Sequence, residues 1–506
     1  TRPAIPQYYP YAFTYRDYVI NAFNNDKPYD QFIREQLAAD LLGMSEDDPD
    51  QAALGLIAVT PMLTNPHDFA DDMIDTVSRG LLGLTVACAR CHDHKFEPIP
   101  TADYYSLYGV FRSIEKPAPE DFEAYPLIQA EAPSAAQQEE FETEKAKIDK
   151  KIQAALKSKR IIGAQRKESD ILQQGEMTRL VTFNPGAPTR AIVVKETNKP
   201  LSPQIFLRGE PDTRGERVPR RFLKLLDPEQ QPFPEDNSGR LALAEKIASP
   251  ENPLTARVFV NRVWGLLLGS YLVNTPSDFG LQGSQPTHPE LLDWLARDFI
   301  RNGWSRKHLV RTIVTSRTYQ QSSTVRSDAS EVDPENLLYH RANLKRMSFE
   351  QLRDSILAMS GQLDPRVLGR SEQLWGDNPS RRRAIYGLVN RIEIDPTMRA
   401  FDFPTPTASA DRRTENIVPQ QALFALNSSF VNHQSRYLVE SLSPEMPEQF
   451  EDQVAVLYQH IYQRQPSPFE QTRIGRFAEL MQKRNTDPLP LIAQSLLISN
   501  EFIYVD

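Results

Sequence analysis

Apolar residues recur at steps of three and four along most of the chain, and this period predicts amphipathic helices. The predicted helices cover residues 15–25, 28–43, 137–159, 241–247, 253–268, 289–301, 305–316 and 348–359, with more helices in the C-terminal part up to 492–504. Short β-branched or aromatic runs at 189–195 and 204–208 predict a small β-module, and 384–389 predicts one more strand. The fold class we expect is mainly α, a multidomain helical protein with a small β-module in the middle.

One predicted helix carries both cysteines of the chain. Its apolar positions recur at steps of four, three, four and three, and they are Val77, Leu81, Leu84, Cys88 and Cys91. A helix that begins after the loop 65–68 would therefore place both thiols on its apolar stripe. The histidine that follows the second cysteine would share the same face.

The sequence Cys88-Ala89-Arg90-Cys91-His92 contains the only two cysteines among the 506 residues. Cys-x-x-Cys-His is the attachment motif of c-type haem, in which both thiols form thioethers and the histidine becomes an axial ligand of the iron. We therefore predict a covalent haem c on Cys88 and Cys91 with His92 as the proximal ligand, so that the c-type haem site lies on a helix. Attachment of this kind would place the protein outside the cytoplasm.

The ligand on the opposite side of the iron would decide the chemistry of the haem. His67, Met62 and Met73 precede the motif within reach of a folded loop, whereas His94 lies too near His92 to cross to the opposite face. We expect His67 to be this second metal ligand. An open position is the alternative, and it would favour catalysis over simple electron transfer.

A short helix after the motif carries an aromatic face. Thr101 is expected to cap this helix, which contains Tyr104, Tyr105, Tyr108 and Phe111. The rings would either pack against a flat macrocycle or form part of an ordinary hydrophobic core. The sequence leaves both interpretations open.

Zinc is the main alternative to haem at the motif. Cys88, Cys91, His92 and His94 put four donors within seven residues, yet structural zinc usually takes ligand pairs from two separated elements. A zinc site would need a further ligand such as His67, and the protein would then be a zinc-dependent hydrolase or a metal-stapled scaffold. A disulfide or two plain thiols are the remaining interpretations of the cysteine pair.

Two groups of basic residues are candidates for binding an anion. Arg341, Lys345 and Arg346 form one group, and Arg412 and Arg413 form the other. Either group would hold a carboxylate, a sulfate or a haem propionate through charge-assisted hydrogen bonds, although arginines are more often members of structural ion pairs. The sequence has no Gly-rich phosphate loop, nucleophile elbow or His-Glu-x-x-His helix.

The overall composition is that of a globular protein. Hydrophobic residues make up 40% of the chain and charged residues 25%. A net charge of -9 is mild for this length and argues against a general nucleic-acid binder. No apolar run approaches the roughly eighteen residues needed to cross a bilayer, so we expect no membrane span in this chain.

Changes of period and composition divide the chain into four predicted segments. Residues 1–116 are expected to be the haem-binding domain, and residues 117–177, rich in Glu and Lys, a charged helical arm. Residues 178–236 are the small β-module, and residues 237–506 are a second helical domain. The arm would connect domains, or its helix 137–159 would bind a partner, which would make the protein a non-catalytic surface interaction module.

Several stretches of the sequence resemble one bacterial protein family. They are 84–100 around the cysteines, Asp103-Tyr104-Tyr105, Arg240-Leu241-Ala242, 252–264, Asp278-Phe279-Gly280, 287–296 and Ser499-Asn500-Glu501-Phe502. The first two are similar to the planctomycete cytochrome domain of the DUF1549 family, and the others are similar to the DUF1553 domain that usually follows it. The resemblance covers nearly the whole chain, so that segment 1–116 is DUF1549-like and segment 237–506 is DUF1553-like.

The resemblance implies an exported protein, periplasmic or otherwise outside the cytoplasm, of a kind common in bacteria that degrade sulfated polysaccharides. Such proteins often carry another cytochrome domain upstream, and the DUF1549-like segment is expected to be incomplete at its N-terminus. The partners implied are a redox partner protein or that upstream domain, together with a carbohydrate substrate. We therefore expect a c-type cytochrome in electron transfer, or a haem-dependent oxidoreductase tied to polysaccharide breakdown.

Overall fold

A computed structural model describes residues 9–59, 65–115, 121–159, 161–162, 166–376, 379–391 and 393–505. The described chain is mainly helical, as the sequence predicts, and its strands form two-stranded pairs. Two compact units can be separated. The first comprises Thr1–Ala342, Leu368–Arg370 and Pro406–Arg412, and the second comprises Asn343–Val367, Ser371–Thr405 and Arg413–Asp506. Residues of the predicted segment 237–506 therefore contribute to both units.

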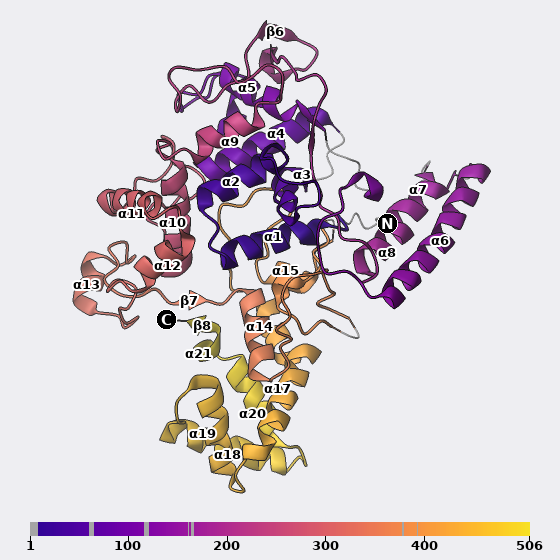
Figure 1. Ribbon diagram of the computed structural model, residues 1–506. Helices are drawn as coiled ribbons and strands as arrows, with labels where there is room; N and C mark the ends of the chain where they lie inside the picture. The colour runs from indigo at the N-terminus through magenta and orange to yellow at the C-terminus, as the bar shows by residue number, and fades with distance from the viewer. Residues whose placement is uncertain are drawn as a thin grey trace. The chain divides into compact units, whose positions relative to one another are not determined.

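The first unit begins with a group of helices and single helical turns (Figure 1). They are α1 (Ala12–Asn24), α2 (Tyr29–Ala38), η1 (Ala39–Leu41), η2 (Pro49–Leu54), α3 (Gly55–Ala58), α4 (Pro66–Val77), η3 (Ser78–Leu82), η4 (Val86–Arg90) and α5 (Thr101–Phe111). The second predicted helix is confirmed, because Pro28 precedes α2 and Gly43 adopts a left-handed conformation just after η1. Glycine is the residue that tolerates this conformation best.

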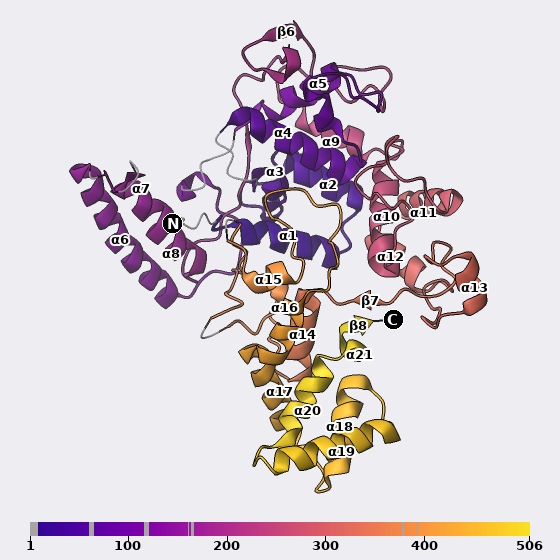
Figure 2. The same ribbon diagram turned by 180° about the vertical axis from the view of Figure 1, so that it is seen from behind.

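A charged helical segment and several short strands follow. They are β1 (Ile114–Glu115), η5 (Phe122–Ala124), α6 (Ala135–Ser158), β2 (Ile161–Ile162), β3 (Arg166–Lys167), α7 (Glu168–Leu172), η6 (Gln173–Met177), α8 (Thr178–Phe183), β4 (Lys195–Glu196), β5 (Gln204–Phe206), η7 (Leu207–Gly209) and β6 (Arg214–Arg217). Ser134 and Gln137 form a capping box that starts α6. In both views α6 lies beside α7 and α8 (Figure 2), and the charged helix predicted at 137–159 is confirmed as α6.

The predicted strands are only partly confirmed. Residues 204–206 of the run 204–208 form β5, which pairs with β6, and of the run 189–195 only Lys195 lies in a strand. Within that run, the carbonyl oxygen of Thr189 accepts from the N–H of Ile128, and the N–H of Ala191 donates to the carbonyl oxygen of Pro126. The strand predicted at 384–389 is wrong, since η8 (Ala384–Tyr386) is a helical turn whose first N–H is taken by the Asp354 carboxylate at 2.8 Å.

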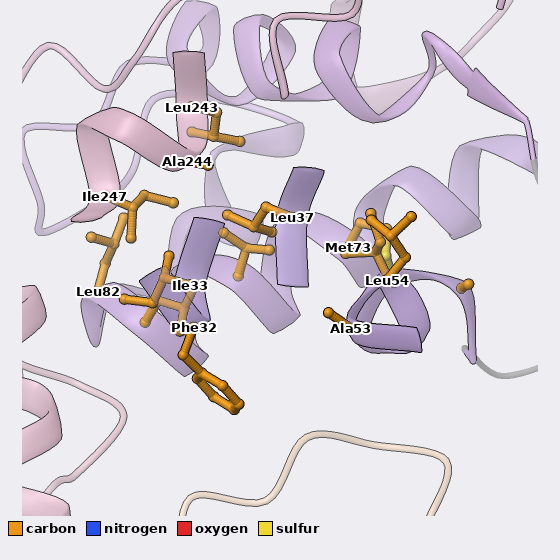
Figure 3. Packing of buried hydrophobic residues seen from close by; sticks show 14 of the residues in the cluster. Phe32, Ile33, Leu37, Ala53, Leu54, Met73, Leu82, Leu243, Ala244 and Ile247 are labelled. Atoms are coloured by element: carbon orange, nitrogen blue, oxygen red, sulfur yellow. The ribbon is translucent and has the colours of Figure 1, made fainter. Parts of the chain in front are cut away.

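The helices α9 (Arg240–Ala248), α10 (Thr255–Leu268), α11 (Pro289–Arg301), α12 (Arg306–Val314) and α13 (Ser327–Val332) complete the first unit. α9 packs against α2, and Figure 3 shows Leu243 and Ile247 of α9 facing Ile33 and Leu37 of α2. These four side chains are almost completely buried. Their burial removes apolar surface from water and so holds the later helices on the N-terminal ones.

Arg240 is the charged residue at this contact, and its side chain is completely buried. Its guanidinium donates two hydrogen bonds to the Asp40 carboxylate, at 3.0 and 2.8 Å, and two to the Glu196 carboxylate, at 3.1 and 2.7 Å. It also donates to the carbonyl oxygen of Leu37. A buried guanidinium is tolerated only when its charge and its donors are matched in this way.

The second unit consists of β7 (Lys345–Arg346), α14 (Phe349–Met359), η8, α15 (Pro396–Ala400), α16 (Pro419–Asn427), α17 (Ser429–Leu442), η9 (Ser443–Glu445), α18 (Phe450–Tyr462), α19 (Pro468–Gln482), α20 (Pro488–Leu497), α21 (Asn500–Ile503) and β8 (Tyr504–Val505). The helix predicted at 348–359 is confirmed as α14, and Ser348 and Gln351 form a capping box at its start. β8 pairs with β7, and α17 lies beside α20 over a separate core.

Replacing Arg240 by methionine should destabilise the first unit by about 3 kcal/mol or more, because the carboxylates of Asp40 and Glu196 would lose their buried partner. Arg34→Met is the matched control. Arg34 also bridges α2 and α9, by an exposed pair with Glu245, and its loss should cost about 1 kcal/mol or less. Calorimetric unfolding measures both, and equal effects of the two variants would contradict the role given to Arg240.

Candidate functional site

The helix predicted to carry the cysteines is interrupted before it reaches them. α4 ends at Val77, η3 continues as one wider helical turn, and Gly83 then adopts a left-handed conformation with φ 62°. The N–H of Leu84 closes back on the Ser78 carbonyl oxygen at 3.1 Å. The prediction of one continuous helix is therefore wrong, because this glycine ends it five residues before Cys88.

The motif, residues 88–92, begins in the short helical turn η4 and points its reactive groups to solvent. Val86 and Ala89 of this turn are buried, whereas Cys88, Cys91 and His92 are exposed. Both cysteines are free thiols. The expectation that the thiols lie on an apolar stripe is wrong, because the tighter turn buries Val86 and Ala89 in their place.

The loop after the motif is held by His94. Its Nδ1 accepts hydrogen bonds from the N–H groups of Phe96 and Glu97, at 3.2 and 2.9 Å, and its Nε2 lies 3.4 Å from the Thr85 hydroxyl. His94 thus stabilises a turn. In the part of the chain that the structure describes, no group of three or more His, Cys, Asp or Glu side chains is placed to hold a metal ion, so the donors of the zinc alternative do not come together.

A second loop clamps both ends of this region. The N–H of Phe279 donates to the Gly83 carbonyl oxygen at 2.8 Å, and the N–H of Leu281 donates to the buried Glu97 carboxylate at 2.7 Å. Gly280 lies so close to this carboxylate that an added Cβ would approach it to 2.3 Å. Residues 279–281 therefore fix the segment that contains the motif.

The aromatic side chains of α5 belong to the hydrophobic core. Tyr104, Tyr105 and Tyr108 are buried, Tyr105 packs edge to face on the other two, and Phe206 from β5 joins them. The hydroxyl of Tyr105 donates to the carbonyl oxygen of Arg90 at 3.0 Å. The interpretation of these rings as part of an ordinary hydrophobic core is therefore confirmed. Through Tyr105 they also hold the last residue of η4.

His67 lies in the first turn of α4 and contacts the same aromatic cluster. Its Nδ1 is 2.6 Å from the Tyr108 hydroxyl, and its ring meets Phe206 edge-on at 5.4 Å. Burial lowers the pKa of His67, and the positive charges of Arg112, Arg214 and Arg90 lower it further. The imidazole is therefore neutral at neutral pH, which is the form that binds metals. Among the alternative ligands, Met73 is buried and Met62 lies outside the described residues.

Three arginines that sequence analysis did not single out lie around His67. Arg90 is 3.8 Å from Asp68 and 3.6 Å from Asp71, Arg112 follows Tyr108 by one turn of α5, and Arg214 stacks on Phe206. We call Arg90, Arg112 and Arg214 the arginine cluster. The four-residue spacing of Tyr108 and Arg112 could have predicted that the two side chains lie on one helical face. The approach of Arg214 to Phe206 depends on tertiary structure alone.

The basic residues that the sequence suggested as anion clamps have other partners. Arg413 pairs with Glu350 at 2.6 Å, Arg346 donates to Gln421, and Arg412 donates to Asn274. Arg341 donates to the neighbouring carbonyl oxygen of Ala342, and Lys345 lies in β7. These contacts are structural, and none of them involves the motif.

Comparison with protein families adds two matches. PSCyt2, described as a protein of unknown function (DUF1549), matches residues 4–116, and PSD1, described as a protein of unknown function (DUF1553), matches residues 239–478. Two segments of the chain thus match these family models, DUF1549 first and DUF1553 second. The resemblance noted in the sequence is thereby confirmed. No curated protein and no solved structure matches the chain.

The two family matches do not coincide with the two compact units. The DUF1553 match extends across the boundary near residue 342, and its first part packs within the first unit together with the DUF1549 match. Glu97 lies in the DUF1549 region, and its partner Leu281 lies in the DUF1553 region. A backbone N–H of the DUF1553 region therefore anchors the loop that follows the motif.

Glu97→Ala should lower the free energy of unfolding of the first unit by about 1.5 kcal/mol or more, because it removes a charge-assisted hydrogen bond. Glu97→Gln keeps an oxygen that accepts from Leu281 and should lose less. Hydrogen exchange at residues 278–283, measured together with chemical unfolding, should quicken most in the alanine variant. Exchange that is unchanged in both variants would show that Glu97 does not anchor the loop.

Proposed function

We propose that the protein is an exported c-type cytochrome that transfers electrons, with haem bonded to Cys88 and Cys91 and His92 as an iron ligand. The observation that carries the proposal is the state of the motif. Its two thiols are free and exposed, stand three residues apart, and are followed by an exposed imidazole. This donor set has the chemistry that thioether attachment needs.

The residues around the motif fit a haem at the protein surface. Val86 and Ala89 anchor η4 in the core, Tyr105 holds the carbonyl oxygen of Arg90, and residues 279–281 clamp the flanking loop. The donors are thus held by a rigid support while they remain accessible from outside. When bound, haem supplies a one-electron couple at its iron.

In this proposal His67 would also bind the haem iron. Its neutral imidazole is positioned through Nδ1 by Tyr108, and no contact to Nε2 is recorded from the described residues. A metal-binding histidine commonly has its other ring nitrogen held by a hydrogen bond, which fixes the direction of the ring. Tyr108 would fill that role here.

Electron transfer is preferred over oxidation of a bound carbohydrate because all three groups of the motif are exposed. Exposure suits exchange of electrons with a redox partner protein or with an upstream cytochrome domain. Covalent haem attachment also motivates the assignment to the periplasm or another location outside the cytoplasm. No helix among the described residues is long and apolar enough to span a membrane.

The full chain, produced with export and cytochrome c maturation, should show a haem Soret band that survives acid-acetone extraction. Cys88→Ala combined with Cys91→Ala should remove the extraction-resistant haem, because no thioether can form. Thr85→Ala is a control that changes the neighbouring loop and keeps both thiols. Absence of bound haem in the unaltered chain would refute the proposal.

His67→Ala should convert the spectrum of the haem-loaded protein from the low-spin form to a form with one weak or exchangeable axial ligand. The reason is that the alanine has no donor for the sixth position. His308→Ala is the control, since His308 is held by Asp298 at 2.7 Å within the first unit. If both variants keep the spectrum of the unaltered protein, His67 is not an iron ligand.

A further inference from the structure

The arginine cluster has an unusual charge balance. Arg214 places its guanidinium carbon 4.2 Å from the centre of the Phe206 ring, and His67 contacts the edge of the same ring. Arg112 stands at the end of α5, one turn beyond Tyr108, whose hydroxyl is 2.6 Å from His67. The positive charges of Arg112 and Arg214 both lower the pKa of His67, and both counteract the rise in the pKa of Tyr108 that burial causes.

Among the residues that the structure describes, Arg90 is the member of the cluster with acidic neighbours within ion-pair distance. Arg90 lies 3.8 Å from Asp68 and 3.6 Å from Asp71, which are long contacts. For Arg112 and Arg214 no ion pair with a carboxylate is recorded within the described residues, and the Nε of Arg112 is buried without a hydrogen-bond partner there. Positive charges held together in this way are stabilised when an anion binds between them.

The cluster is connected to the motif by a short piece of backbone. η7 follows Phe206 directly, and Gly209 at its end adopts a left-handed conformation with φ 77°. An added Cβ on Gly209 would lie 2.6 Å from the Sγ of Cys91, so the backbone there passes directly against that thiol. Phe206, whose ring lies under Arg214, and Gly209, whose backbone passes the Cys91 thiol, are thus three residues apart on one supporting segment.

We propose that Arg112 and Arg214, beside His67 and Tyr108, bind a carboxylate, and that in the haem-loaded protein this carboxylate is a haem propionate. The second clause rests on the proposed function, because it requires haem at Cys88 and Cys91. The planar guanidinium is well suited to a carboxylate, since it presents paired N–H donors in a fixed geometry. The arginine cluster would then position the haem that the thiols hold.

The same chemistry has a second source, which is the carboxylate of a free small molecule. A propionate belongs to the haem itself and would occupy the arginines permanently. A soluble carboxylate would bind whether or not haem is attached. The two sources can therefore be separated by comparing the haem-loaded chain with a haem-free one.

The test uses the full chain with Cys88→Ser and Cys91→Ser, to which haem cannot bond covalently. Iron protoporphyrin IX and its dimethyl ester, in which both propionates are neutralised, are titrated separately and followed by absorbance. The diacid should bind about tenfold tighter or more, since a hydrogen bond to a charged group contributes about 1.5 kcal/mol or more. Arg112→Gln and Arg214→Gln, added to this background, should each reduce that preference.

Arg217→Gln is the matched control. Arg217 lies on the same strand as Arg214, is exposed, and loses the same charge, but it pairs across the strand with Gln204 rather than stacking on Phe206. It should keep the full preference for the diacid. Equal binding of the two porphyrins, binding of neither, or a preference that survives both glutamine substitutions would overturn the assignment.

Benzoate titrations separate the two sources of carboxylate. If a propionate fills the site, benzoate should bind to the haem-free chain and not to the haem-loaded one. Benzoate bound equally by both, and lost in Arg214→Gln, would overturn the propionate assignment in favour of a soluble carboxylate. Extraction-resistant haem without a diacid preference would refute this site alone, whereas a diacid preference without covalent haem would refute the proposed function alone.

Discussion

Burial of the Arg240 guanidinium is the constraint on which the first unit depends. A fully buried positive charge needs both a counter-charge and partners for its N–H donors, and Arg240 finds them in Asp40, Glu196 and the carbonyl oxygen of Leu37. Three segments that are far apart in the sequence therefore have to meet at one point. Because Arg240 is the first residue of α9, this meeting also seats the apolar face of α9 on α2.

The contact between α9 and α2 explains how the DUF1549 region and the first part of the DUF1553 region form one structural unit. Once α9 and α10 are docked, the loop at 279–281 reaches Gly83 and Glu97, on either side of the motif. The DUF1549 region supplies the thiols and His92, and the DUF1553 region supplies the backbone N–H groups that hold the surrounding loop. A rigid support beneath exposed donors is what a surface-bound cofactor requires, since the donors have to stay both accessible and fixed.

The sequence predicted those features that depend on local physics. α11 and α14 follow from apolar period and from the capping box at Ser348, which neighbouring residues determine. The prediction of a helix through the cysteines was wrong because the helix ends at Gly83. The carbonyl oxygen of Gly83 accepts a hydrogen bond from the N–H of Phe279, which lies far along the chain. The approach of Arg214 to His67 also depends on tertiary structure, because it requires β5, which pairs with β6, to pack on α5. The division into four segments stays a prediction.

The most direct test of the account is the mass of the peptide that contains residues 88–92, isolated from the full chain after export with cytochrome c maturation. The account predicts a mass greater by one haem, with both cysteines consumed as thioethers and resistant to alkylation. A peptide whose two cysteines are alkylated as free thiols, or are joined to each other as a disulfide, would contradict it.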